Sequence, residues 1–184
     1  MIYTWNELTQ KEGSRYLLEN LISKGRYKKI SHGLYSDGDS NELEELFARY
    51  PKATLTMQSA FEYYELSNYI PEKYYIVTPR NHCVITNDKV DQSYANSEVI
   101  NIGRIEADTK YGHIYIYDLE RMLIELFRMK NKLPRDYYLE VISSYRELFI
   151  NEAISSYKLS EYCKHFKNGL SILRNIQEVF AWKN

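Results

Sequence analysis

The chain has 184 residues, of which 44% are hydrophobic, and its formal net charge at pH 7 is −1. This composition predicts a globular chain with a real hydrophobic core, built as one domain or as a small domain followed by a larger one. No apolar run approaches the roughly 18 residues of a membrane span, and Met1–Gly13 lacks the apolar segment of a signal peptide. We therefore expect a cytoplasmic protein without a membrane partner, in which Cys83 and Cys163 are free thiols because neither belongs to a CxxC pair.

Two short helices are predicted at the start of the chain. Thr4 and Glu7 have capping-box spacing, which favours a helix over about Trp5–Gln10. A second helix begins after Ser14, whose hydroxyl can cap it, and ends before Gly25, which suits the left-handed position beyond a helix C-terminus. The apolar residues of this helix recur at three- and four-residue steps, which predicts that they share one buried face: Leu17, Leu18, Leu21 and Ile22.

A tight basic hairpin is predicted next. Tyr27–Ile30 and Leu34–Ser36 can pair as strands joined by Ser31-His32-Gly33, because glycine tolerates a positive φ. Helix, glycine and basic hairpin is the order of a winged helix-turn-helix, in which the helix enters a DNA major groove and the hairpin lies against phosphates.

The distribution of charge agrees with that prediction. Met1–Ser36 contains six Lys or Arg and three Glu, a balance of +3, which leaves −4 for the rest of a chain whose net charge is −1. A basic tip attracts phosphates, since each neutralised phosphate releases counterions. The alternative is a solvated sheet edge, where lysines block pairing with other chains.

The clearest linker is Asp37–Asn41, five small or polar residues without an apolar anchor. It predicts two domains, a winged helix-turn-helix at 1–37 and a mixed α+β domain at 42–184. Strands are expected in the first half of the second domain at 53–55, 74–78, 83–86, 99–102, 104–107 and 114–117, with helices at 42–50 and around Ala60 to Leu66. From Asp118 onward the apolar pattern is helical, with helices from 118, from Pro134, at 152–166 and at 170–182, so the fold class is α+β with a helical C-terminal half.

Catalytic motifs are not found in the sequence. It has no Gly-rich phosphate loop, no HExxH and no GxSxG, and its four histidines are scattered. His82-Cys83 and Cys163-x-His165 do not match a common zinc spacing. Glu106-x-Asp108-x-Lys110 leaves open a metal-dependent nuclease, although charged turns of this kind are common. We expect a binding protein rather than an enzyme, with no cofactor and no metal.

An ordered set of short blocks resembles the AbiEi-type antitoxins, which are transcriptional regulators of bacterial phage-defence operons acting by abortive infection. The first block, Arg26–Tyr35, is similar to the wing of that family. The later blocks follow in the family's order between Ser14 and Arg146: Ala48-Arg49-Tyr50-Pro51, Thr54–Ala60, Ile70-Pro71-Glu72, Val77-Thr78-Pro79-Arg80, Asp118–Leu123 and Phe127-Arg128. The family usually has a further helix before the helix-turn-helix, so the resemblance implies a trimmed winged helix here.

The resemblance implies a two-domain repressor in a type IV toxin–antitoxin system. Its winged helix would bind inverted repeats in double-stranded DNA of its own promoter. Its larger domain would counteract a cognate nucleotidyltransferase-like toxin without forming a stable complex with it.

These lines of reasoning together select candidate DNA-binding residues. For the groove we expect the polar residues at the start and middle of the second helix, which can reach base edges or phosphates: Ser14, Arg15, Tyr16 and Asn20. For the phosphates we expect the cations of the helix end and the hairpin, with one histidine: Lys24, Arg26, Lys28, Lys29 and His32. Two alternatives stay open, a protein-interaction module that does not bind DNA and, less favoured, the nuclease with Glu106 and Asp108.

Overall fold

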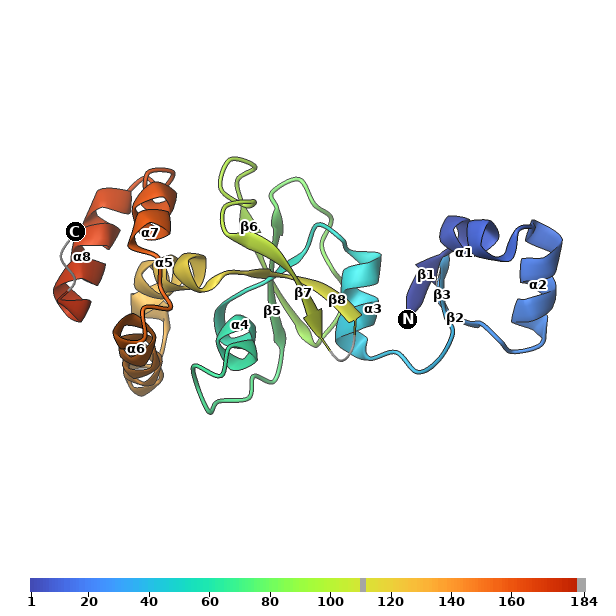
Figure 1. Cartoon of the computed structure of the whole chain (residues 1–184), viewed down its shortest axis with the longest axis horizontal. Helices are drawn as coiled ribbons and strands as arrows, with labels where there is room; N and C mark the ends of the chain where they lie inside the picture. The colour runs from blue at the N-terminus through green and yellow to red at the C-terminus, as the bar shows by residue number, and fades with distance from the viewer. Residues whose placement is uncertain (110–111, 182–184) are drawn as a thin grey trace. The chain divides into compact units, whose positions relative to one another are not determined.

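The computed structural model describes residues 1–109 and 112–181, with side chains for all of these except 108, 109 and 112. The protein is of the mixed α+β class, as expected, with two β-sheets in the part that is described (Figure 1). The chain divides into two compact units, Met1–Lys52 with Glu106–Tyr115, and Ala53–Ile105 with Ile116–Asn184. The segment 37–41, expected between two domains, therefore lies within the first unit.

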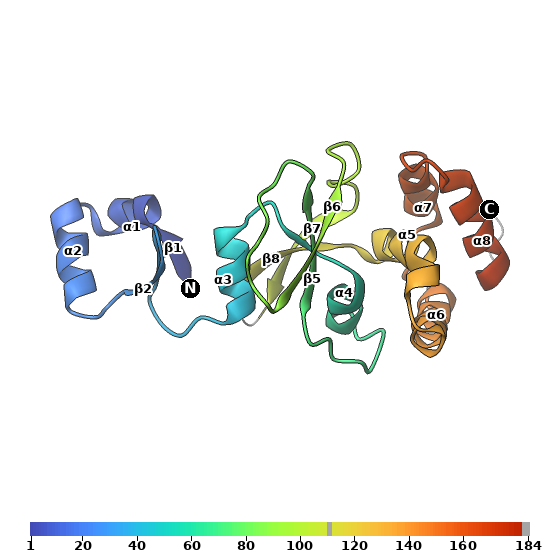
Figure 2. The same ribbon diagram turned by 180° about the vertical axis from the view of Figure 1, so that it is seen from behind.

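The first unit is built on a three-stranded antiparallel sheet with the strand order β1-β3-β2, and Figure 2 shows helices α1 and α2 beside it. Its elements in chain order are β1 (Ile2–Thr4), α1 (Trp5–Glu12), α2 (Arg15–Ser23), β2 (Lys28–Ser31), β3 (Leu34–Ser36) and α3 (Glu42–Arg49). Helices α1 and α2 and the hairpin bury a small core of Leu8, Leu18, Tyr27 and Tyr35, against which Tyr3, Trp5, Leu21 and Ile22 pack.

The start and end signals predicted for α1 and α2 are confirmed. Thr4 and Glu7 form a capping box, in which the Thr4 hydroxyl accepts from the Glu7 amide. Ser14 Oγ accepts from the Leu17 amide at 3.2 Å. At the other end of α2 the amides of Gly25 and Arg26 donate to the carbonyls of Ile22 and Leu21, both at 3.0 Å, and Gly25 has a φ of +77°. This is a Schellman motif, which needs a left-handed residue at the glycine.

The expectation that Leu17 is buried is wrong. Leu17 is 50% exposed, whereas Leu18, the next residue, is fully buried. The core below α2 is narrow, because it consists mainly of rings from the hairpin and β1, and it reaches Leu18, Leu21 and Ile22 only. Leu17 therefore lies on the border between the packed and exposed faces of the helix.

The second unit contains most of a five-stranded mixed sheet with the order β6-β5-β4-β8-β7. Strand β4 pairs antiparallel with β5 and parallel with β8, and β5 pairs parallel with β6. The elements in chain order are β4 (Thr54–Leu55), α4 (Met57–Tyr63), β5 (Tyr74–Pro79), β6 (Val90–Ala95), β7 (Arg104–Thr109), β8 (Gly112–Tyr117), α5 (Leu119–Met129), the 3₁₀ turn η1 (Lys130–Lys132), α6 (Arg135–Ile150), α7 (Ser156–Cys163) and α8 (Gly169–Phe180). The C-terminal part of β7, from Glu106 onward, and the N-terminal part of β8, as far as Tyr115, belong to the first unit.

Two predicted strands are loops, and one strand was not predicted. Residues 83–86 do not form a strand, because the Gln92 side chain bonds two of their backbone groups in place of a neighbouring strand. Gln92 Oε1 accepts from Ile85 N at 2.8 Å, and Gln92 Nε2 donates to Cys83 O at 3.1 Å. Residues 99–102 form turns whose carbonyls accept from the Arg121 guanidinium. The missed strand, β6, lies at the sheet edge and is mostly polar, so it lacks the apolar alternation that identifies a strand.

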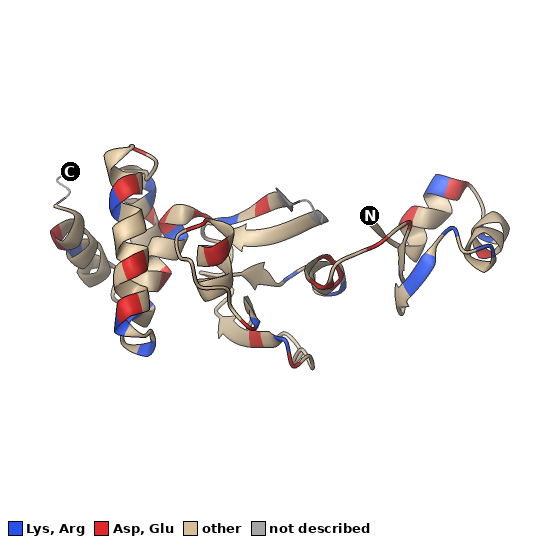
Figure 3. Ribbon diagram, turned by 90° about the horizontal axis from the view of Figure 1, so that it is seen from below, with Lys and Arg blue, Asp and Glu red and all other residues tan. Residues whose placement is uncertain are grey.

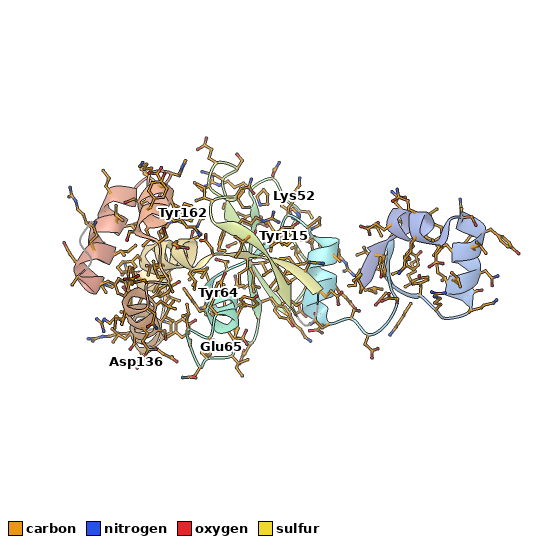
Figure 4. All side chains as sticks on the ribbon, in the orientation of Figure 1. Lys52, Tyr64, Glu65, Tyr115, Asp136 and Tyr162 are labelled. Atoms are coloured by element: carbon orange, nitrogen blue, oxygen red, sulfur yellow. The ribbon has the colours of Figure 1, made fainter. Side chains whose placement is uncertain are left out.

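The C-terminal half is helical, as predicted, and α5 is its most buried element. Met122, Leu123, Ile124 and Leu126 of α5 are fully buried. Two tyrosines tie neighbouring helices to the residues before α5: Tyr64 Oη donates to the Tyr117 carbonyl at 2.8 Å and Tyr162 Oη donates to Asp118 Oδ2 at 2.9 Å (Figure 4). Within residues 1–109 and 112–181 no helix is both long and apolar enough to cross a membrane.

Candidate nucleic-acid interface

One face of α2, together with its C-cap residue, carries two of the predicted groove residues, Tyr16 and Asn20, and one predicted phosphate contact, Lys24. Tyr16, Asn20 and Lys24 follow one another at four-residue steps, which places them on one side of the helix, opposite the buried Leu18. Tyr16 is 77% exposed, and Asn20 is half-buried. A helix with this face can present a ring, an amide and a cation together.

The side chains of Ser14 and Arg15 already have hydrogen-bond partners within α2. The Ser14 hydroxyl accepts a hydrogen bond from the helix backbone, so its main task is to cap α2. Arg15 Nε donates to Glu19 Oε1 at 2.9 Å in an exposed pair one helical turn apart. Such surface pairs contribute little to stability, so a phosphate can replace Glu19 as the partner of Arg15.

The β2–β3 hairpin presents two exposed lysines side by side in sequence. Lys28 lies opposite Ser36 and Lys29 opposite Tyr35, and the register shifts between Lys29 and Ser31. Gly33 has a φ of +77°, as expected for the turn, and its carbonyl accepts from the Trp5 amide. His32 is exposed at the same turn.

Four cations of this surface have no acidic partner among the residues that the structure describes. They are Lys24, Arg26, Lys28 and Lys29. Arg26 lies over the ring of Tyr27, with 5.9 Å between its guanidinium carbon and the ring centroid. From Ser14 to Ser36 there are five Lys or Arg and one Glu, a balance of +4. We call the exposed residues of α2 and the hairpin, Arg15 to His32, the basic surface.

Acidic residues adjoin the basic surface and limit its extent. Helix α3 begins with Glu42, Glu44 and Glu45, and Figure 3 shows acidic residues along it and basic ones over the hairpin. Over Met1–Lys52 the eight Lys or Arg equal the eight Asp or Glu in number. Lys28 and Lys29 line a hollow of about 210 Å³ together with Asp39 and Glu45. The positive field is therefore confined to α2 and the hairpin.

A polar cluster that the sequence reasoning missed holds β1 to the end of β3. Asp37 accepts from the Met1 ammonium at 2.9 Å and from Tyr3 Oη at 3.0 Å, and Lys11 Nζ donates to Tyr3 Oη at 3.0 Å. The ammonium lowers the pKa of Asp37, and the hydrogen bond to Tyr3 raises the pKa of Lys11. Lys11 is thereby held away from the basic surface. Sequence separation hides this cluster, because Tyr3 and Asp37 carry no local signal that joins them.

Tyr27 links α1 to the hairpin. Its hydroxyl donates to Glu12 Oε1 at 2.5 Å, and this hydrogen bond raises the pKa of Tyr27. Its ring lies edge-on to that of Tyr3, with 6.4 Å between centroids. The contact fixes the hairpin against the helices and so sets where its lysines lie.

The alternative catalytic and metal sites gain no support from the geometry. Glu106 Oε1 is 3.8 Å from His113 Nδ1, while Lys110 and the side chain of Asp108 lie outside the described residues. Burial raises the pKa of the Cys163 thiol to about 11, and Cys83 is exposed beside His82. Within the described part of the chain, no group of three or more His, Cys, Asp or Glu side chains could hold a metal ion.

Compared with known proteins, the sequence matches no protein-family model and no curated protein.

Proposed function

We propose that the protein is a DNA-binding transcriptional regulator in which α2 enters the major groove and the β2–β3 hairpin lies against the phosphates as a wing. The observation that carries the proposal is a group of four cations at one helix end and the adjoining strand that have no acidic partner among the described residues: Lys24, Arg26, Lys28 and Lys29. Phosphate contacts of this kind supply most of the affinity in DNA binding.

The arrangement of the first unit supports the same proposal. Its order β1–α1–α2–β2–β3, with the strand order β1-β3-β2, is compatible with the part of a winged helix that follows the first helix. In this arrangement Tyr16 and Asn20 face bases, since an asparagine amide can bond both N6 and N7 of adenine. Ser14 holds the start of α2, and Arg15 and His32 add phosphate contacts at the edges.

We further propose that the regulator acts as AbiEi-type antitoxins do, repressing its own operon in the cytoplasm and counteracting a nucleotidyltransferase-like toxin without a stable complex. The support is the ordered resemblance. Its blocks coincide with structural boundaries: Arg26–Tyr35 covers the hairpin, Tyr50-Pro51 follows α3, Thr54–Ala60 spans β4 and the start of α4, and Asp118–Leu123 opens α5. On this proposal the protein itself needs no catalytic residues.

A mobility-shift titration tests the DNA-binding proposal. The probes are the duplex upstream of the protein's own gene and a shuffled duplex of equal length. We expect a shift at micromolar protein that weakens steeply as salt rises, and a tighter complex with the upstream duplex. Absence of any salt-sensitive shift would refute the proposal.

A second candidate function is a protein-interaction module, favoured by one observation. Tyr16 and Leu17 expose two large apolar side chains next to each other on α2, and such side chains are enriched where proteins meet. If that role is correct, the unaltered chain will show no preference for the upstream duplex, and replacing Tyr16 and Leu17 with Ser will leave the comparison between the two duplexes unchanged. The regulator proposal instead predicts that this variant loses the preference for the upstream duplex over the shuffled one.

A further inference from the structure

A groove in the second unit, lined by both apolar and charged side chains, has no role in the proposed DNA binding. It consists of two hollows of about 200 Å³ and 310 Å³, which share the lining residues Thr56, Met57, Ser93 and Met129 and are therefore contiguous. Strands β5 and β6, the start of α4 and the C-terminal end of α5 supply its walls. Binding sites for small molecules commonly occupy about 300–1,000 Å³, so the groove has the size of such a site.

The groove carries more positive than negative charge. Arg80 lines the first hollow and Lys132 the second, and neither side chain has a hydrogen bond or ion pair within the described parts of the chain. Arg128 also lines the first hollow, and its Nη1 donates to both carboxylate oxygens of Glu125 at 2.6 and 2.7 Å. Its Nε and Nη2 donate to no acceptor in the described residues, so both are available to a ligand.

Arg121 adds to the excess of positive charge at the groove. It lies 1% exposed beside Glu125, and its Nη2 is 2.8 Å from Glu125 Oε1. Two guanidinium groups therefore share one carboxylate, which leaves a positive charge at the wall of the first hollow. Together the groove's four cations outnumber its two carboxylates, Glu125 and Asp91, whereas the whole chain has a net charge of −1.

The second hollow has the chemistry to hold an aromatic ring with polar edges. Tyr75 supplies a phenol ring from β5, Asp91 a carboxylate from β6, and Gln58 an amide from α4. An aromatic face stacks on a nucleobase, and the carboxylate and amide can bond sugar hydroxyls or base edges.

Backbone strain marks the same place. Among the residues that the structure describes, four non-glycine residues have a positive φ, and three of them, Glu65, Glu152 and Ala181, follow or end helices, where a left-handed residue is ordinary. The fourth, Met57, has a φ of +48° at the first position of α4, where no helix-ending motif explains it. Met57 lines both hollows, and strained residues of this kind cluster at binding sites.

We propose that this groove binds a nucleoside phosphate. The phosphate contacts Arg80 and Arg128 in the first hollow, and the base and sugar lie in the second hollow against Tyr75, near Asp91 and Gln58. Guanidinium groups suit this ligand because their planar donors match phosphate oxygens two at a time. The site lies in the second unit and makes no use of the basic surface.

Isothermal titration calorimetry of the full chain tests the proposal with the four ribonucleoside monophosphates and triphosphates, the four nucleosides and inorganic phosphate. We expect at least one nucleotide to bind more tightly than its nucleoside and more tightly than phosphate. The Arg80→Ala variant should bind that nucleotide about tenfold more weakly, the usual size of one lost charge-assisted hydrogen bond. The control is Arg146→Ala, an exposed arginine of α6 away from the groove residues, which should bind like the unaltered chain.

Each contrary result identifies its own error. If no nucleotide binds, or if Arg80→Ala and Arg146→Ala bind equally well while both keep the melting temperature of the unaltered chain, the site is wrong. If phosphate alone binds as well as any nucleotide, the second hollow does not hold a base. If a short single-stranded oligonucleotide binds more tightly than every mononucleotide, the mononucleotide assignment is overturned. The mobility shift on duplex DNA is a separate measurement, and Arg80→Ala should leave it unchanged.

Discussion

Replacing Lys28 and Lys29 together with alanine removes half of the cations on which the proposed DNA binding depends. Within the described part of the unaltered chain, four such cations have no acidic partner: Lys24, Arg26, Lys28 and Lys29. If each neutralises one phosphate, a plot of log affinity against log salt has a slope of about −3.6, and the double variant has a slope of about −1.8.

The difference in slope gives a large difference in measurable affinity. Raising salt fourfold, from about 50 to about 200 mM, should weaken the unaltered chain about 150-fold and the double variant about 12-fold. Because phosphate contacts carry no sequence information, the variant should lose affinity equally for the upstream duplex and a shuffled one. Both lysines are exposed and unpaired in the first unit, so the variant should keep its fold.

Fluorescence anisotropy of labelled duplexes at five or more salt concentrations measures both slopes. A matched control replaces two exposed lysines of the second unit, Lys73 and Lys167, with alanine and should keep the steep slope. If the slope of the Lys28/Lys29 variant equals that of the unaltered chain, and circular dichroism shows both folded, the hairpin does not contact phosphates and the wing assignment is wrong.

Further predictions concern stability. Gly169→Ala should lower the free energy of unfolding by about 3 kcal/mol, because a Cβ there would lie 1.7 Å from the Cys163 carbonyl oxygen, whereas Gly38→Ala, with no atom within 4 Å, should be nearly neutral in a urea titration. Arg121→Leu should cost about 3 kcal/mol by breaking its buried pair with Glu125, and adding Glu125→Leu should restore part of the loss if the charge is the cause. Burial raises the pKa of the Cys163 thiol from 9.0 to about 11. The buried protonated thiol therefore contributes fully to the free energy of unfolding below pH 9.0, and this contribution is lost as pH rises through about 11. Cys163→Ala should flatten the fall in melting temperature across that interval, and an unchanged fall would exclude this thiol as its source.

The sequence predicted the first unit well because its signals are local. The capping box of Thr4 and Glu7, the Ser14 cap and the left-handed Gly25 each depend on residues within one helical turn. The exposure of Lys28 and Lys29 was equally predictable, since short charged strands rarely bury such side chains. What local signals could not give was Leu17, whose exposure depends on how far the core beneath α2 extends.

In the second unit, two failures of prediction share one physical cause, which is that side chains from outside the segment satisfy its backbone groups, and the third failure, strand β6, has another cause. The loop at 83–86 and the turns at 99–102 are apolar enough to read as strands, but Gln92 and Arg121 bond their backbone groups. Strand β6 becomes a strand only by pairing with β5. The groove could not be predicted from the sequence either, because Arg80, Arg128 and Lys132 come from separate elements and form no sequence motif.

Glu125 connects the stability of the second unit with the proposed ligand groove. On one side it forms an ion pair with Arg121. The Nη1 of Arg121 donates to the Val99 and Ile102 carbonyls, and its guanidinium carbon lies 4.3 Å from the ring centroid of Tyr117. On the other side it bonds Arg128 at the wall of the groove. A buried carboxylate with two guanidinium partners costs less to desolvate than one with a single partner, because the second charge offsets the penalty. A phosphate bound at Nε and Nη2 of Arg128 would draw on the positive charge that also stabilises Glu125, so Glu125 would then depend more strongly on Arg121. Ligand binding and the packing of the 99–102 turns against α5 therefore depend on the same carboxylate, and we expect nucleotide to change hydrogen exchange at Val99–Ile102 as well as at the groove.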